Sequence, residues 1–148
     1  MPESLSDASI TKALRKKGYK ATTQRIAICR LALSSREHRT AREIYREVKT
    51  LHPTVSLATV YNTLQVLREL NLVQELAFPQ GESKFDSNLT PHVNVVCLRC
   101  GSVRDVNDRA VQDVVARVAS RTRFAVARQR FDIYGTCEKC ARRTKANP

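Results

Sequence analysis

The chain of 148 residues carries 26 lysines and arginines against 14 aspartates and glutamates, which gives a formal net charge of +12 at pH 7. Its apolar share of 42% and charged share of 27% are those of a globular protein and exclude a chain that is disordered throughout. No stretch approaches the ~20 apolar residues of a membrane helix, and residues 1–4 lack the basic and apolar regions of a secretory signal. We therefore expect a cytoplasmic protein with no membrane partner. The positive charge indicates an acidic partner, with nucleic acid as the first candidate. The alternative is a basic surface that contacts only solvent.

The first half of the chain has the residue spacing of helices. Residues 7–17 place apolar side chains on one face and stop at Gly18, a residue type that commonly follows a helix. Thr22 or Thr23 is expected to cap a second helix that runs to about Leu33.

Two further helices are predicted from their capping residues. Thr40 and Glu43 have the spacing of a capping box, in which each side chain accepts a hydrogen bond from the other residue's backbone. This third helix is expected to stop before Pro53. Ser56 is expected to cap a fourth helix, whose leucines and valines recur at intervals of three and four residues.

A β-hairpin is expected after the fourth helix. Residues 72–78 and 83–85 are β-prone, and the Pro-Gln-Gly sequence at 79–81 indicates the turn between them. Helices followed by a hairpin are typical of a winged helix-turn-helix, so we expect residues 1–86 to form such a domain. The polar residues 87–91 are expected to be a linker.

The second half, residues 92–148, is predicted to be a mixed α/β domain, so the fold class is α+β. Short strands are expected at 93–97 and 103–106, and an amphipathic helix at 107–121. A long strand is expected at 124–134. Either a dimer partner or the 107–121 helix would cover the apolar face of this strand, which consists of Ala125, Ala127, Phe131 and Ile133.

Two CxxC pairs are the strongest local motif, and they consist of Cys97, Cys100, Cys137 and Cys140. Disulfides do not persist in the cytosol, and four thiolates from two such pairs match a tetrahedral structural Zn²⁺ site. A redox dithiol is the alternative. The fifth cysteine, Cys29, lies on the apolar face of its helix and is expected to be buried.

Four further side chains have the chemistry of metal ligands but are scattered over both halves: His38, Asp86, His92 and Asp105. Each also has an ordinary explanation, such as a polar loop, a strand end or a helix cap. A hydrolytic metal centre or a thiol reductase would use similar groups. No motif supplies a general base or a nucleophile beside them, so we expect no catalytic residue and a protein that is not an enzyme.

Several segments resemble the ferric uptake regulator family of metal-dependent transcriptional regulators. The resemblance spans residues 18–140 and is carried by residues 21–25, 56–64, 84–86 and 133–137 and by the two CxxC pairs. It implies an N-terminal winged-helix DNA-binding domain, a C-terminal dimerisation domain and a homodimer that represses promoters while a regulatory metal is bound.

The resemblance also implies the ligands of that metal, which in the family lies between the two domains. Transferred position by position, they are His38, Asp86, His92, Asn94 and Asp105. The family usually has histidine at position 94. The amide oxygen of asparagine does not suit Fe²⁺ as well as imidazole does, so Fe²⁺ and Mn²⁺ are both candidates. A second family site has no counterpart, because Arg128 and Gln129 replace its histidines.

The peroxide-sensing branch of the family fits this sequence better than the iron-sensing branch. Peroxide sensors tend to have aspartate at the Asp105 position, and both His38 and His92 are available for oxidation when bound Fe²⁺ meets H₂O₂. The implied function is a repressor that peroxide releases from promoter DNA. The alternative is an iron- or manganese-responsive repressor without oxidation chemistry.

The fourth helix is expected to enter the DNA major groove. The face opposite its leucines offers Thr59, Tyr61, Asn62 and Thr63. Lys84 on the hairpin is expected to reach either the DNA backbone or the minor groove. Phosphate contacts are also expected from the basic run of the first helix, Lys12, Arg15, Lys16 and Lys17, and the alternative for this run is a solvated helix face. Arg25 is expected to hold either phosphate or neighbouring structure. A purely architectural DNA-binding protein would bind DNA without metal.

Overall fold

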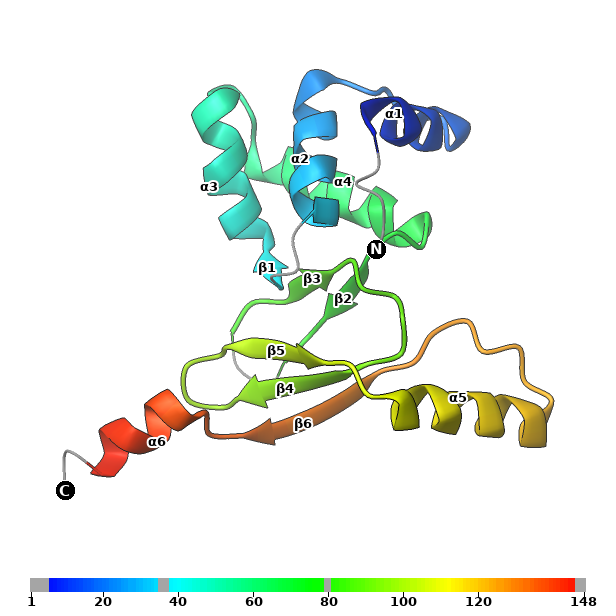
Figure 1. The fold of residues 1–148 in the computed structure, drawn as a ribbon. Helices are drawn as coiled ribbons and strands as arrows, with labels where there is room; N and C mark the ends of the chain where they lie inside the picture. Colours follow the sequence, from blue (N-terminus) through cyan, green and yellow to red (C-terminus); the bar gives the residue numbers. More distant parts are fainter. Residues whose placement is uncertain (1–5, 35–37, 79–80, 146–148) are drawn as a thin grey trace. The chain divides into compact units, whose positions relative to one another are not determined.

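A computed structural model describes residues 6–34, 38–78 and 81–145 of the chain. The chain divides into two compact units, Met1–Leu89 and Thr90–Pro148 (Figure 1). Each unit is an α+β structure with its own three-stranded sheet. Among the described residues, no helix combines the length and apolar character needed to cross a membrane.

The first unit contains the four predicted helices. They are α1 (Asp7–Lys16), α2 (Thr23–Ser34), α3 (Ala41–Leu51) and α4 (Leu57–Glu69). The capping box before α3 is confirmed, because Thr40 Oγ1 accepts from the Glu43 amide at 3.2 Å and the Glu43 carboxylate accepts from the Thr40 amide at 2.7 Å. The Ser56 hydroxyl likewise accepts from the Thr59 amide at 3.1 Å at the start of α4.

A small antiparallel sheet completes the winged helix. It consists of β1 (Arg39–Thr40), β2 (Gln74–Leu76) and β3 (Lys84–Asp86) in the order β1-β3-β2. The β2–β3 hairpin was predicted, although β2 is shorter than the expected 72–78 because only three of its residues pair with β3. The two-residue β1 was not predicted. Of the expected 79–81 turn, residues 79–80 lie outside the described residues.

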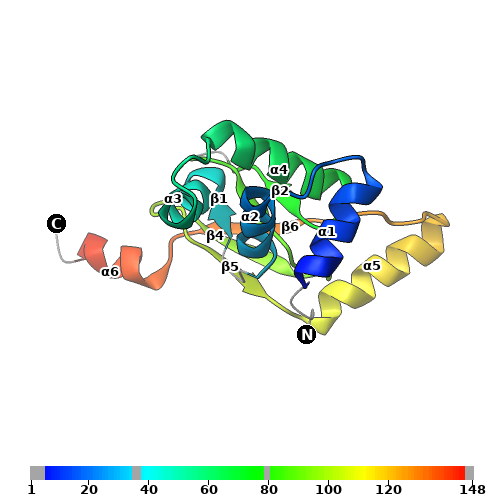
Figure 2. The same ribbon diagram turned by 90° about the horizontal axis from the view of Figure 1, so that it is seen from above.

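The helices of the first unit enclose its core, with α2 packed against α1, α3 and α4. Figure 2 shows α2 lying among these three helices. Ile28, Ile44, Val60 and Leu64 are completely buried in this core, as is Cys29. Burial raises the pKa of the Cys29 thiol from 9.0 to about 12, because the charged thiolate is disfavoured away from water. The predicted packing role of Cys29 is consistent with this position.

The second unit is a sheet with two peripheral helices (Figure 1). Its elements are β4 (Val93–Cys97), β5 (Val103–Val106), α5 (Arg109–Thr122), β6 (Phe131–Gly135) and α6 (Glu138–Lys145). The sheet order is β5-β4-β6, with β4 antiparallel to β5 and parallel to β6. The central strand β4 is therefore flanked on both sides. This arrangement determines which side chains meet.

Two expectations for the second unit need correction. The long strand predicted at 124–134 is wrong, because β6 covers only Phe131–Gly135, the five residues that pair with the five residues of β4. Ala125 and Ala127 therefore precede the strand and share no strand face with Phe131 and Ile133. The 107–121 helix does not cover this face in the single chain, since Ile133 is 58% exposed and α5 contains no buried residue. Helix α6 was not predicted.

Candidate metal sites and nucleic-acid interface

The four CxxC thiols lie together in the second unit. Their sulfur atoms all lie within 4.8 Å of one another, and the Cys100 and Cys137 sulfurs are 3.8 Å apart. A tetrahedral zinc ion with Zn–S bonds of about 2.3 Å places its sulfurs roughly 3.8 Å apart. The thiols thus match a closed four-sulfur zinc site.

The sheet register brings the two CxxC pairs together despite their separation in sequence. Cys97 ends β4 opposite Gly135 near the end of the parallel strand β6, so both pairs follow strands at the same edge of the sheet. The Leu98 amide donates to the Gly135 carbonyl at 2.8 Å, and the Cys137 amide donates to the Cys97 sulfur at 3.3 Å. Gly101 has a φ of +69°, a conformation that glycine adopts without strain.

The electrostatics of the cluster favour a bound cation. Backbone amides of Cys137, Cys100 and Arg99 lower the pKa of Cys97 to about 6, because hydrogen bonds stabilise the thiolate. Hydrogen bonding with the Cys137 thiol, burial and the other thiols raise the pKa of Cys140 to about 12. A zinc ion bound by the four sulfurs would offset this difference between the thiols, because its charge stabilises the deprotonated form of a ligand.

The first unit contributes two of the predicted regulatory ligands. The His38 Nε2 atom lies 3.9 Å from the Asp86 carboxylate, and both side chains are buried. Asp86 ends β3, where its Oδ1 atom accepts from the Asn88 amide at 2.8 Å and its Oδ2 atom from the Gln74 amide group at 3.1 Å. These hydrogen bonds fix the carboxylate beside the imidazole. One nitrogen and one oxygen ligand are thus already paired.

The second unit brings the other three predicted ligands together. Asn94 lies opposite Asp105 in the β4–β5 register, and His92 precedes Asn94 by two residues, a spacing that places both on one face. The His92 Nε2 atom lies 3.3 Å from Asn94 Oδ1 and 3.5 Å from Asp105 Oδ1. One nitrogen and two oxygens converge here, as a divalent cation requires.

Asp132 also contacts this ligand set, through Asn94, although it was not predicted from the sequence. It lies opposite Asn94 in the β4–β6 register, and its Oδ1 atom accepts from the Asn94 amide nitrogen at 3.1 Å. Partial burial tends to raise the pKa of Asp132, but hydrogen bonds from Arg130, Tyr134 and Asn94 and the Arg130 charge lower it below its ordinary value. The alternation of Arg130, Asp132 and Tyr134 was the signal available in the sequence, although only Asp132 and Tyr134 lie on β6.

Three of the four predicted base-contacting residues on α4 have solvent access. Tyr61 and Asn62 are exposed and Thr59 is half-buried. Thr63 is completely buried, and its hydroxyl donates to the Thr59 carbonyl at 2.7 Å. The assignment of Thr63 to DNA contact is therefore corrected, because Thr63 lies on the buried face of α4 with Val60, Leu64 and Leu67.

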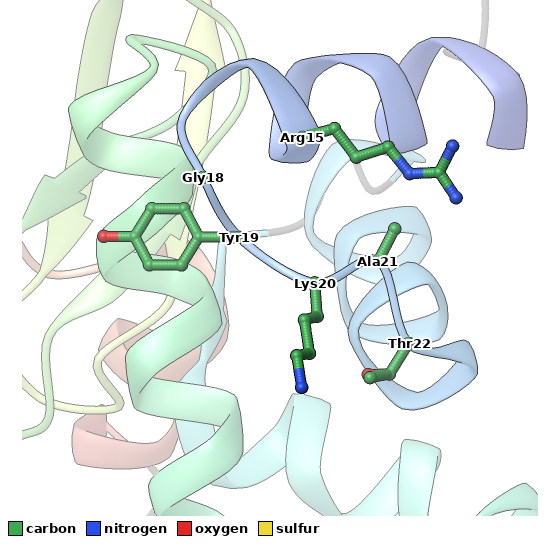
Figure 3. A pocket seen from close by; sticks show the side chains of 6 residues that line it. All are labelled: Arg15, Gly18, Tyr19, Lys20, Ala21 and Thr22. Atoms are coloured by element: carbon green, nitrogen blue, oxygen red, sulfur yellow. The ribbon is translucent and has the colours of Figure 1, made fainter.

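A shallow surface hollow of about 450 Å³ lies at the turn between α1 and α2 (Figure 3). Arg15 and Lys20 line it, and the Tyr19 ring points toward α4, where its hydroxyl donates to Glu69 at 3.4 Å. Arg25 donates to the Lys20 carbonyl at 3.0 Å and thus holds neighbouring structure. The other cations predicted to contact phosphate are accessible to solvent. Lys84 is half-buried on β3, and the exposed side chains on or directly after α1 are Lys12, Lys16 and Lys17.

The fold and these ligand sets define a metal-binding protein built from a winged-helix unit and a thiolate-zinc unit. The sequence model of the ferric uptake regulator family matches residues 16–134. The chain belongs to the ferric uptake regulator family.

Similar proteins span nearly the whole chain. The peroxide-responsive repressor PerR of Staphylococcus epidermidis is 38% identical over 86% of this chain and 85% of its own. The crystal structure of the Campylobacter jejuni peroxide stress regulator is 30% identical, with a TM-score of 0.72, and the match covers 88% of this chain and 98% of that one. The Helicobacter pylori ferric uptake regulator Fur, at 20% identity, shows the shared fold with a TM-score of 0.78 over 95% and 97% of the two chains.

Proposed function

We propose that this protein is a homodimeric, metal-dependent transcriptional repressor that binds promoter DNA with its regulatory metal bound and is released by peroxide. The observation that carries the proposal is the convergence of His92, Asn94 and Asp105 within one unit of a family member. The relative named as a peroxide-responsive repressor supports the peroxide response. We assign the protein to the cytoplasm and give it no catalytic residue.

The regulatory metal would be held by His38 and Asp86 of the first unit together with His92, Asn94 and Asp105 of the second. A metal that takes ligands from both units would couple metal binding to the arrangement of the units, because the ion stabilises the arrangement in which both sets of ligands reach it. If DNA binds the same arrangement, metal and DNA each increase the affinity for the other by the same factor. The thiolate zinc in the second unit would keep that unit folded whether or not the regulatory metal is present.

The two ligand imidazoles are the groups through which peroxide would act. Bound Fe²⁺ supplies the chemistry that reduces H₂O₂ beside these rings. Oxidation of His38 or His92 removes a nitrogen ligand of the site. The ligand set then holds its metal less tightly, and the arrangement of the two units that binds DNA is lost.

The DNA contacts of the proposal come from the first unit. Asn62 and Tyr61 are exposed on α4, and an asparagine pairs with adenine through both of its polar atoms. The basic side chains of α1 would neutralise phosphates and position the helix. Six such phosphate contacts give a slope of about −5 for log K against log[salt].

A second candidate function is a manganese- or iron-responsive repressor without oxidation chemistry. The observation in its favour is Asn94, because a neutral amide oxygen suits Mn²⁺ better than the iron that peroxide sensing requires. The two candidates share the DNA-binding role and differ in the response of the iron form to H₂O₂.

Fluorescence anisotropy of a labelled promoter fragment tests the shared part of the proposal. The zinc-loaded protein is expected to bind tightly with Mn²⁺ and weakly without it, with the salt slope given above. Asp113→Ala, which removes an exposed carboxylate of α5, is the control and should bind as the wild type does. Equal binding with and without Mn²⁺ would contradict metal dependence, and a flat salt response would contradict the phosphate contacts.

A further inference from the structure

The side chain of Asn94 occupies a defined position between two aspartates on neighbouring strands. Asp105 of β5 and Asp132 of β6 lie directly opposite it in the two registers. Only Asp105 belongs to the predicted ligand set. Asp132 contacts the amide of Asn94 through its nitrogen, whereas His92 lies 3.3 Å from its oxygen.

We propose that Asp132 is a positioning residue that directs the Asn94 amide oxygen toward the regulatory metal and thereby makes this position a neutral oxygen ligand that favours Mn²⁺ over Fe²⁺. The inference rests on the proposed function, since it concerns the same site. It adds a residue outside the ligand set and a basis for metal preference.

Hydrogen-bond chemistry fixes the orientation of the amide. An ionised carboxylate only accepts hydrogen bonds, so the Asn94 group 3.1 Å from the Asp132 Oδ1 atom is the NH₂ donor. The oxygen of the amide must then be the atom that lies 3.3 Å from His92 Nε2. An amide turned the other way would face Asp132 with its oxygen, and two acceptors would oppose each other there.

The tautomer of His92 places a third acceptor atom beside the oxygens of Asn94 and Asp105. The His92 Nδ1 atom lies 2.7 Å from the Thr90 carbonyl oxygen, which only accepts, so in the neutral ring, the form that binds a metal, Nδ1 carries the hydrogen and Nε2 the lone pair. Nε2 therefore faces Asn94 Oδ1 at 3.3 Å and Asp105 Oδ1 at 3.5 Å. Three acceptor atoms gathered in this way repel one another, and a cation among them turns that repulsion into attraction.

Asp132 is itself held firmly enough to orient its neighbour. Its Oδ2 atom accepts from the Arg130 guanidinium at 2.8 Å and from the Tyr134 hydroxyl at 2.9 Å, which leaves Oδ1 for the Asn94 amide. Asp132 and Tyr134 alternate on β6 and so share one face of the sheet, and Arg130 immediately precedes this strand. Without Asp132 the amide loses the partner that selects its orientation.

The oriented amide has a consequence for metal choice. Carbonyl and carboxylate oxygens suit Mn²⁺, whereas imidazole suits iron and zinc. With Asn94 the unit-two set is one nitrogen and two oxygens, and a histidine at that position would make it two nitrogens and one oxygen. We expect Asn94→His to raise the affinity for Fe²⁺ relative to Mn²⁺.

A double-mutant cycle on the full-length, zinc-loaded protein tests the proposal. Mn²⁺ affinity is measured by electron paramagnetic resonance of the free ion for wild type, Asp132→Ala, Asn94→Ala and the double variant. Loss of a residue that orients a ligand costs about 10- to 100-fold in metal affinity, and we expect this loss for Asp132→Ala. The double variant should bind no more weakly than Asn94→Ala, because Asp132 acts only through that amide.

Controls separate this effect from a general loss of charge or of structure. Asp113→Ala removes one exposed carboxylate from the same unit and should keep wild-type affinity. Zinc content and the thermal midpoint show that each variant is folded. Asn94→His should bind Co²⁺, used as a probe for Fe²⁺, with a changed ligand-field absorption.

Three results would overturn the proposal. Wild-type Mn²⁺ affinity in folded Asp132→Ala, losses that add in the double variant, or an unchanged metal preference in Asn94→His would each contradict it while leaving the proposed function intact. A wild-type chain that binds no Mn²⁺ beyond its thiolate zinc would overturn the proposed function and this inference together.

Discussion

Removal of the thiolate zinc should unfold the second unit and leave the first unit folded. The two units differ greatly in their apolar cores. Among the described residues of the second unit, the buried apolar side chains are Val96, Cys97 and Cys140, and two of these belong to the four-thiol cluster. The first unit encloses a continuous cluster of buried apolar side chains on four helices. The second unit therefore depends on its metal far more than the first.

The loss of folding free energy on zinc removal can be worked out from the contribution of a structural zinc site. A structural zinc site contributes about 10–16 kcal/mol to folding at pH 7, which matches or exceeds the whole stability of a typical domain at 5–15 kcal/mol. Cys137→Ser breaks the site at one ligand, and we expect the second unit of this variant to be unfolded at 25 °C. Cys29→Ala is the matched control, because Cys29 lies in the core of the first unit and contributes no ligand.

Hydrogen exchange followed by mass spectrometry reports on the two units separately. In the zinc-loaded wild type, peptides from α2, α4 and β4 should all be protected. After chelation under reducing conditions, or in Cys137→Ser, the β4 peptides should exchange at once while those of α2 and α4 keep their protection. Persistent protection of β4 in the zinc-free chain would refute the reasoning.

Three further predictions concern the first unit. Cys29 stabilises the fold fully below its ordinary pKa of 9.0, and this contribution is lost as the pH rises toward about 12, so the free energy of unfolding should fall by about 1.4 kcal/mol per pH unit above 9 relative to Cys29→Ala. Thr40→Ala should cost about 1 kcal/mol of unfolding free energy in urea titrations, whereas Thr50→Ala, at an exposed site, should cost less. Asn62→Ala should weaken promoter binding by about 1–3 kcal/mol with unchanged stability, and Thr63→Val, which alters a buried hydroxyl, should show the reverse; equal effects on binding would contradict the orientation of α4.

The helices of the first unit were predictable because local interactions determine them. The capping pattern of Thr40 and Glu43 and the cap at Ser56 depend on residues three apart, and both are present in the structure. Strand β1 was not predictable, because two residues show no periodicity. The limits of β6 were not predictable either, since the length of its partner β4 sets them rather than the alternation in residues 124–134.

The residues of the candidate sites likewise divide into those that local spacing reveals and those that depend on pairing between strands. The CxxC spacing identified the four thiols directly, whereas the contact of Asp132 with Asn94 depends on the β4–β6 register, which the sequence does not reveal. Thr63 was misassigned because it lies beside Asn62 in sequence, yet one further residue turns the side chain by about 100° into the core.

Release from DNA by peroxide is tested by measuring DNA binding of the Fe²⁺ and Mn²⁺ forms before and after dilute H₂O₂. Anisotropy of the labelled promoter gives the binding, and mass spectrometry of the same samples follows the peptides that contain His38 and His92. We predict that the iron form releases DNA as one of these peptides gains the mass of an oxygen atom, while the manganese form stays bound and unmodified. Release of DNA by the iron form with both histidines unmodified would contradict it.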